Sequence, residues 1–135
     1  MTTFNLARAL GATLIGLSLA GSATVARADP KDYEFQLVHK EMKKGDGAVV
    51  AVRLVDRRTG KPVPDAVIFA KRIDMAPDGM PTMTAPLEPL PSTEPGVYRF
   101  KTNLAMEGGW QLSLGAKVQG ETGTVENKLV LKATP

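Results

Sequence analysis

The sequence contains no cysteine. Disulfide bonds, thiolate metal sites and cysteine nucleophiles are therefore excluded, and no thiol is available for acylation as in a lipoprotein. Histidine is almost as scarce, since His39 is the only one. A Ser-His-Asp triad would have to use this residue, and no serine lies in a G-x-S-x-G motif. Phosphate-binding and dinucleotide-binding glycine motifs are also absent from the sequence. We therefore expect that the protein is not an enzyme.

The first 28 residues have the features of a secretory signal peptide. Arg8 precedes an uncharged apolar stretch over residues 9–20, and Ala26-Arg27-Ala28 forms an A-x-A cleavage site. An uncleaved membrane anchor is the alternative, but the apolar stretch is shorter than the ~20 residues that a spanning helix needs. We expect cleavage after Ala28 and a periplasmic protein, without stable membrane insertion once the signal is removed.

Most of the excess positive charge belongs to the predicted signal peptide. The full chain has 17 basic and 14 acidic residues, a net charge of +3. Removing Arg8 and Arg27 leaves 15 basic and 14 acidic residues in the mature chain, residues 29–135. No run of Lys or Arg remains that could follow a phosphate backbone, so we expect no binding to nucleic acid.

The mature chain is dominated by alternation of apolar and polar residues, which is the pattern of half-buried β-strands. It is long enough for one domain with a core that needs no disulfide bonds. Short strands separated by turns containing Gly and Pro predict an immunoglobulin-like β-sandwich of about seven antiparallel strands, and a small barrel is the alternative. The clearest expected strands are residues 33–37, 48–55, 66–73, 97–102, 110–118 and 125–131.

Methionine has the most unusual distribution. Met75, Met80 and Met83 all lie in residues 74–86, which we expect to form one long loop. Thioethers are soft, neutral ligands that suit Cu(I) or Ag(I), and they need no deprotonation. Met106 lies in a second loop that could meet the first at one end of the sandwich. His39 is a weaker candidate ligand.

Two other interpretations of these methionines remain open. Methionine is an adaptable hydrophobic residue, so the side chains could fill one end of the core. A methionine-bearing loop could also be a docking surface for a protein partner. Met42, near the end of the first expected strand, is a further weak candidate for a metal site.

Four segments, in this order, resemble the YtkA-like/FixH-like domains. They are TGKPVPDA at residues 59–66, the methionine segment at 74–83, GVYRF at 96–100 and MEGGWQL at 106–112. The resemblance extends from about residue 48 to residue 131. The turn at 59–66 also occurs in other immunoglobulin-like modules, so the order of the four segments carries more weight than any one of them.

The resemblance implies an envelope β-sandwich associated with copper handling, in efflux or in delivery to copper oxidases. Carried onto this sequence, the implied site comprises Met75, Met80, Met83 and Met106. The expected function is therefore a periplasmic accessory protein that binds Cu(I) or Ag(I) and passes it to an efflux or oxidase-assembly protein. The alternative is a metal-free interaction module of an envelope efflux or assembly system.

Overall fold

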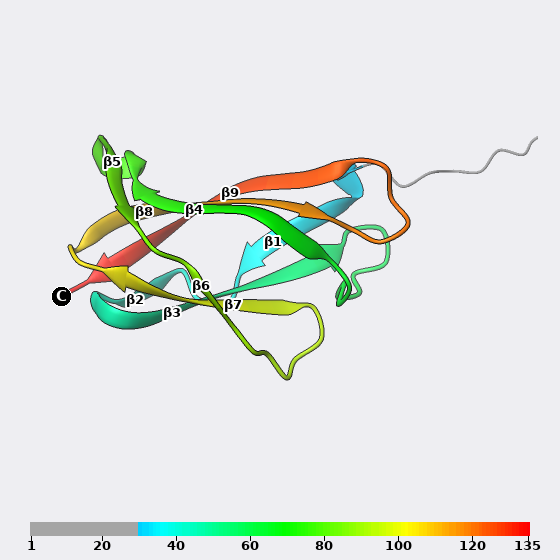
Figure 1. The fold of residues 1–135 in the computed structure, drawn as a ribbon, viewed down its shortest axis with the longest axis horizontal. Helices are drawn as coiled ribbons and strands as arrows, with labels where there is room; N and C mark the ends of the chain where they lie inside the picture. The colour runs from blue at the N-terminus through cyan, green and yellow to red at the C-terminus, as the bar shows by residue number, and fades with distance from the viewer. Residues whose placement is uncertain (1–29) are drawn as a thin grey trace, which may run out of the picture.

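Two β-sheets pack face to face and confirm the expected β-sandwich (Figure 1). This computed structural model describes residues 30–135, so the predicted signal peptide lies outside the described residues. The first element is a short 3-10 helix, η3, at Pro30–Asp32. Within residues 30–135, no helix is long and apolar enough to cross a membrane.

The first sheet has four strands in the order β1-β3-β7-β6. All of its pairings are antiparallel. A bulge interrupts the pairing of β3 with β7 between Asp46 and Ala48. The bounds of its strands are β1 Tyr33–Leu37, β3 Gly45–Asp56, β6 Glu88–Leu90 and β7 Val97–Leu104.

The second sheet has five strands in the order β2-β9-β8-β4-β5. Its longest ladder joins β8 to β9 over ten residue pairs, from Gly108↔Ala133 to Lys117↔Thr124. The short helix η4, Ala76–Asp78, connects β4 to β5. The bounds of its strands are β2 Glu41–Lys43, β4 Val67–Met75, β5 Met80–Ala85, β8 Gly108–Lys117 and β9 Thr124–Thr134.

The strand orders are those of an immunoglobulin-like sandwich. The first sheet corresponds to strands A, B, E and D, and β9, β8 and β4 correspond to G, F and C. After β1 the chain crosses to the other sheet, where β2 pairs with β9 in parallel. This one parallel pairing is an addition to the antiparallel arrangement expected from the sequence.

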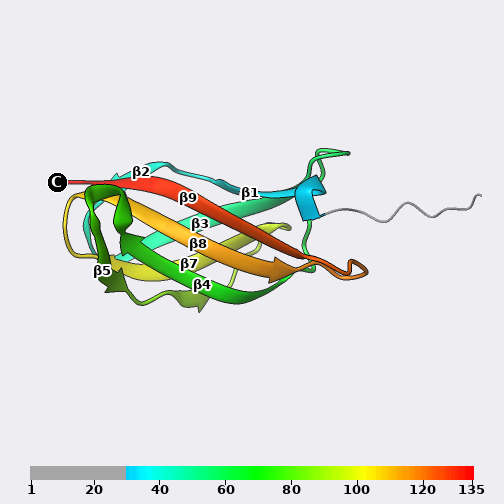
Figure 2. The same cartoon turned by 90° about the horizontal axis from the view of Figure 1, so that it is seen from above.

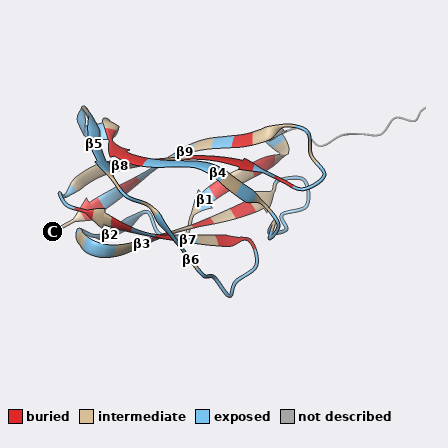
Figure 3. Cartoon of the chain, in the orientation of Figure 1, coloured by how far each residue is buried: buried red, intermediate tan, exposed pale blue. Residues whose placement is uncertain are grey.

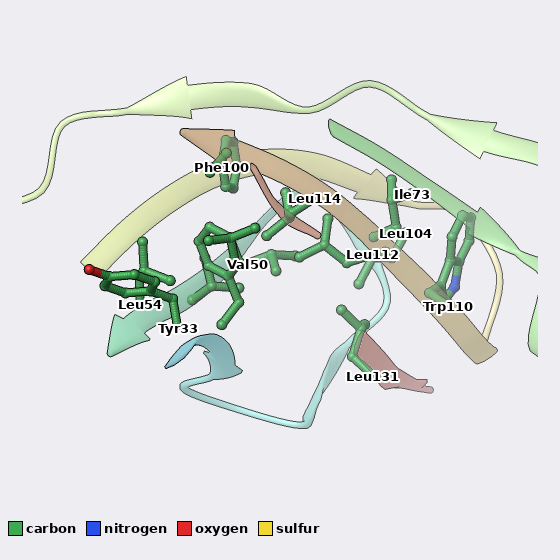
Figure 4. Packing of buried hydrophobic residues seen from close by; sticks show 14 of the residues in the cluster. Tyr33, Val50, Leu54, Ile73, Phe100, Leu104, Trp110, Leu112, Leu114 and Leu131 are labelled. Atoms are coloured by element: carbon green, nitrogen blue, oxygen red, sulfur yellow. The ribbon is translucent and has the colours of Figure 1, made fainter. Parts of the chain in front are cut away.

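The core lies between the two sheets and is formed by their inward faces (Figure 3). On β8, Trp110, Leu112, Leu114 and Ala116 are all buried, as the alternation predicts. Leu104 and Leu131 are among the other buried side chains around them (Figure 4). Burial of a side chain of this size contributes about 1.5–3 kcal/mol to folding, so packing can stabilise the domain without disulfide bonds.

A polar cluster joins the two sheets at the end opposite β5. The hydroxyl of Tyr33 on β1 donates a hydrogen bond of 2.8 Å to a carboxylate oxygen of Glu121 in the β8–β9 turn. Arg58 approaches the same hydroxyl from the loop after β3. Burial and the hydrogen bond to Glu121 together raise the pKa of Tyr33 to about 12. The phenol is therefore neutral at physiological pH and acts as a hydrogen-bond donor.

Candidate functional site

One end of the sandwich brings together the segments that carry the methionines. The η4–β5 hairpin, the β7–β8 turn and the C-terminus all lie at this end, as two perpendicular views show (Figures 1 and 2). We call it the methionine end and define it by Met75, Met80, Met83 and Met106. Its geometry depends on how β4 turns into β5.

Residues 74–86 were expected to form a loop, but most of them form a β-hairpin. β4 continues to Met75, η4 turns the chain, and β5 returns from Met80 to Ala85. Pro77 lies at the start of η4, and Gly79 ends it with a φ of 76°, a left-handed conformation that favours glycine. The expectation of an open loop was wrong because the Pro-Asp-Gly sequence specifies a tight turn.

Asp74 organises the start of this turn. Its side chain is almost fully buried, and its Oδ1 accepts a hydrogen bond of 2.9 Å from the backbone N–H of Ala76. Its Oδ2 accepts a hydrogen bond of 2.8 Å from Nε of Arg72. Burial opposes the charged form, but the hydrogen bonds from Arg72 and Ala76, with the charges of Arg72 and Lys128, outweigh it. The pKa of Asp74 is therefore held below its ordinary value.

Arg72 extends this network to β5. Its second guanidinium nitrogen donates a hydrogen bond of 2.7 Å to the carbonyl oxygen of Pro81. The β4–β5 pairing passes from Met75↔Met80 directly to Asp74↔Thr84, so residues 81–83 bulge out of the ladder. Arg72 thus anchors the bulge that carries Met83.

The start of β8, directly after the β7–β8 turn, packs against η4 through two glycines. Asp78 accepts a hydrogen bond of 3.2 Å from the backbone N–H of Gly109. A Cβ atom on Gly108 would collide with the Asp78 carboxylate and would lie 3.1 Å from the terminal methyl of Met75. A Cβ on Gly109 would lie 2.9 Å from the side chain of Pro77. Glycine is therefore required at positions 108 and 109, because η4 packs directly on their backbone and leaves no room for a side chain.

The four methionines of this end occupy different depths. Met75 is fully buried, with 0% of its surface exposed, and Met80, its partner in register, is partly buried against the core. Met83 and Met106 are 36% and 40% exposed. Met75 therefore packs in the core, while Met83 and Met106 are partly exposed to solvent.

Comparison with known proteins assigns the family. A family model described as YtkA-like matches residues 27–115, which include every candidate residue named above. The chain belongs to the YtkA-like family. No curated protein matches the sequence. A solved structure titled "ZirS C-terminal Domain" is similar with a TM-score of 0.43 and 13% identity, over 96% of this chain and 88% of that one.

In this YtkA-like domain, His39 lies far from the methionine hairpin. It is exposed in the connection before β2, whereas Met83 lies on β5, and these two strands are the opposite edges of the five-stranded sheet. Four interstrand spacings of ~4.8 Å separate the two edges by roughly 19 Å. Met42 on β2 is partly buried against the core, level with Ala133 and two strands from Gly108.

Acidic and histidine side chains do not form a metal site in the described part of this YtkA-like domain. Residues 30–135 contain no group of three or more His, Asp or Glu side chains placed to hold a metal ion. The residues of the methionine end that sequence reasoning missed are Asp74, Arg72 and Asp78. The Pro-Asp-Gly sequence at residues 77–79 could have indicated the turn, but the partner of each charge depends on the strand pairing.

Proposed function

We propose that the protein is a periplasmic carrier that binds Cu(I) or Ag(I) at the methionine end and passes the ion to an envelope partner. The observation that carries the proposal is the packing of η4 and Met75 on Gly108 and Gly109. The helix leads into β5, which bears Met80 and Met83, and the glycines follow the turn that bears Met106. Thioether sulfur is a soft ligand that suits monovalent copper and silver. Family membership supports an envelope role.

The proposal divides the methionines into two groups. Met80, Met83 and Met106 retain some exposure and serve as the ligands. Met75 forms the floor, because its terminal methyl is packed beside Gly108 and none of its surface is exposed. Exposed neutral ligands favour exchange with a partner, since the ion can gain one new ligand before it loses an old one.

Cu(I) titration of purified residues 29–135 against a competing chromogenic chelator tests this function. The matched variants are the triple substitution Met80→Leu, Met83→Leu and Met106→Leu, and the single substitution Met42→Leu. Leucine preserves size and hydrophobicity and removes only the sulfur. We expect tight binding by the wild-type protein and by Met42→Leu, and loss of it in the triple variant.

The outcome that contradicts the proposal is equal Cu(I) affinity in the wild-type and triple-variant proteins. A titration with Ag(I), followed by the fluorescence of Trp110, provides a second measurement. Trp110 is the only tryptophan, and its indole contacts the backbone of Met106. An unchanged emission spectrum at saturating Ag(I) would also count against a site at this turn.

The exposure of Met83 and Met106 supports a second function, in which the hairpin docks onto an efflux or assembly component without metal. Leucine substitutions would then leave activity in the cell nearly intact, since an apolar surface remains. Met83→Glu and Met106→Glu would abolish this activity, because they place a charge on the docking surface. Copper tolerance of cells carrying these variants separates the functions, because metal binding is abolished by leucine and glutamate alike.

A further inference from the structure

A second feature of the molecule lies away from the methionine end, on the outer face of the five-stranded sheet. The β4–β8 pairing passes from Ile68↔Ala116 to Ala70↔Gly115, so Phe69 is an extra residue in a β-bulge. Its side chain stands on the solvent side, and 55% of the residue is exposed. Bulges are used in proteins to redirect a side chain, and this one presents an aromatic ring on a sheet surface.

Gly115 forms the seat of this ring. A Cβ atom at Gly115 would lie 3.2 Å and 3.3 Å from the Cζ and Cε1 atoms of Phe69, closer than ordinary packing allows. The backbone of Gly115 does not have the positive φ that would itself require glycine. The absence of a side chain at Gly115 therefore leaves room for the Phe69 ring, which packs on the backbone of β8. Phe69 is exposed and also held in place.

The ring borders a groove of about 540 Å³ that is open to solvent. Lys71, Arg72 and Lys128 line it together with a single acidic residue, Glu126. Arg72 is already paired with Asp74. Lys71 pairs with the buried Leu114, so its side chain lies on the opposite face of β4 from Phe69. Lys128 pairs with Ser113 on the outer face and forms no ion pair with a carboxylate of the described chain. The groove thus combines a fixed aromatic surface with the ammonium group of Lys128, and Lys117, the partner of Val67, adds a second ammonium group on the same face.

The apolar surface continues beyond the groove on both sides. Val67 on β4 pairs with Lys117, and Val130 on β9 pairs with Gln111, which places both valines on the outer face. Both are exposed. A small molecule in an open groove would bury only part of its surface, whereas binding pockets usually enclose most of a ligand. A surface of this extent fits a polypeptide.

We propose that this groove binds an extended acidic segment of a partner protein that carries an aromatic or large aliphatic side chain next to Asp or Glu. The apolar side chain packs on Phe69 and the exposed backbone of Gly115. The neighbouring carboxylate pairs with Lys128 or Lys117. The floor of the groove is β8, which is paired with β4 on one side and with β9 on the other, so recognition over it relies on side chains.

The test uses three short fluorescein-labelled peptides of alternating residues: Glu and Phe, Lys and Phe, and Glu and Ser. Affinity for residues 29–135 is measured by fluorescence anisotropy, and the site is mapped by amide chemical shifts. We expect the Glu-Phe peptide to bind and to shift the amides of Phe69, Ser113, Gly115 and Lys128. The Lys-Phe and Glu-Ser peptides should bind at least about fivefold more weakly, a difference of about 1 kcal/mol.

Two variants keep the proposal falsifiable. Phe69→Ser removes the ring, and Lys117→Glu reverses one charge on the same face. Both positions are exposed, so we expect wild-type urea midpoints and a loss of affinity of about fivefold or more, near 1 kcal/mol, in each. Raised salt should also weaken binding, because the carboxylate contacts are screened.

The proposal is overturned by Glu-Phe peptide shifts that map elsewhere, by equal binding of the Lys-Phe peptide, or by unchanged affinity in Phe69→Ser. It is also overturned if sedimentation shows a dimer of the wild-type protein and a monomer of Phe69→Ser, because a second copy of the chain would then cover this face. The result is independent of metal binding, since the triple methionine variant leaves the groove intact.

Discussion

The indole nitrogen of Trp110 donates a hydrogen bond of 3.0 Å to the backbone carbonyl oxygen of Met106. Trp110 is buried on β8, so the bond satisfies a polar group that would otherwise lie unpaired in the core. Met106, by contrast, is 40% exposed, although its backbone is bonded to a buried side chain. The turn therefore offers a thioether from a fixed backbone, an arrangement suited to a preorganised binding site.

The Trp110–Met106 bond can be tested by Trp110→Phe. The variant loses the hydrogen bond and leaves a small cavity, so the free energy of unfolding should fall by about 1–3 kcal/mol. Met106→Leu keeps the carbonyl and is the matched control, with stability expected near wild type. Urea denaturation followed by circular dichroism measures both. A wild-type midpoint for Trp110→Phe would contradict the role assigned to this bond.

Gly108→Ala should disturb the packing of η4 on the start of β8. Its φ is 132°, and a Cβ there meets the Asp78 carboxylate and the Met75 methyl, so we expect a loss of about 1–3 kcal/mol. Gly120→Ala is the control, because its φ of 86° is also positive but nothing lies within 4 Å. The unfolding temperatures of the two variants separate the effects, because both carry backbone strain and only Gly108→Ala also meets η4. Equal losses would show that η4 does not press on Gly108.

Asp74→Asn should change how stability depends on pH. The pKa of Asp74 is lower in the folded protein, so its carboxylate stabilises the fold above the unfolded pKa. That contribution is lost as pH falls through the folded pKa. At neutral pH the wild type should exceed Asp74→Asn by about 1–3 kcal/mol. Below the unfolded pKa of ~3.9 the difference should shrink.

Urea midpoints of both proteins between neutral and acidic pH measure this difference. Arg72→Gln provides a second check, because it removes the first hydrogen bond that lowers the pKa of Asp74. When Arg72→Gln is also present, the difference in unfolding free energy between proteins with Asp74 and with Asn at this position should be smaller at neutral pH. A gap that stays constant across the whole pH range would refute the assignment.

Thr102→Val should stabilise the protein. Thr102 is buried on β7, and its hydroxyl has no hydrogen-bond partner among the described residues. Valine has nearly the same shape and no polar group to desolvate, so a gain of about 1 kcal/mol is expected. Thr102→Ala, which leaves a cavity, should be less stable than valine. A loss of stability in Thr102→Val would reveal a partner for the hydroxyl.

Tyr33 and Tyr98 should ionise at a higher pH than tyrosine in an unfolded chain. The pKa of Tyr33 is raised to about 12, and burial also raises the pKa of Tyr98. Phenolate absorbance of the native protein should therefore appear at higher pH than in guanidinium, where tyrosine ionises near pH ~10. Because the folded pKa is raised, the contribution of Tyr33 to stability is present below pH ~10 and is lost as pH rises toward 12.

Glu121→Gln removes the charge beside Tyr33 and keeps a hydrogen-bond acceptor, so native ionisation should shift to lower pH. Spectrophotometric titration of the wild type and this variant measures the shift. Coincident titration curves for the two proteins would contradict the contact between Tyr33 and Glu121.

The sequence by itself determined the class of fold and the inward face of most strands. Alternation is a local property, since successive side chains of a strand point to opposite faces, and it placed Trp110, Leu112 and Leu114 in the core. It did not reveal β2, β5 and β6, which are short strands, and β5 and β6 contain one proline each. In such short strands the alternation of apolar and polar residues covers too few positions to be recognised from the sequence.

Only the tertiary structure decided which methionines are buried and which turns meet. Met75 and Met83 have the same side chain, yet one is fully buried and the other is partly exposed. The difference arises from the β4–β5 register, the bulge held by Arg72, and the packing of η4 on Gly108. These are contacts between residues far apart in sequence, and no local periodicity encodes them.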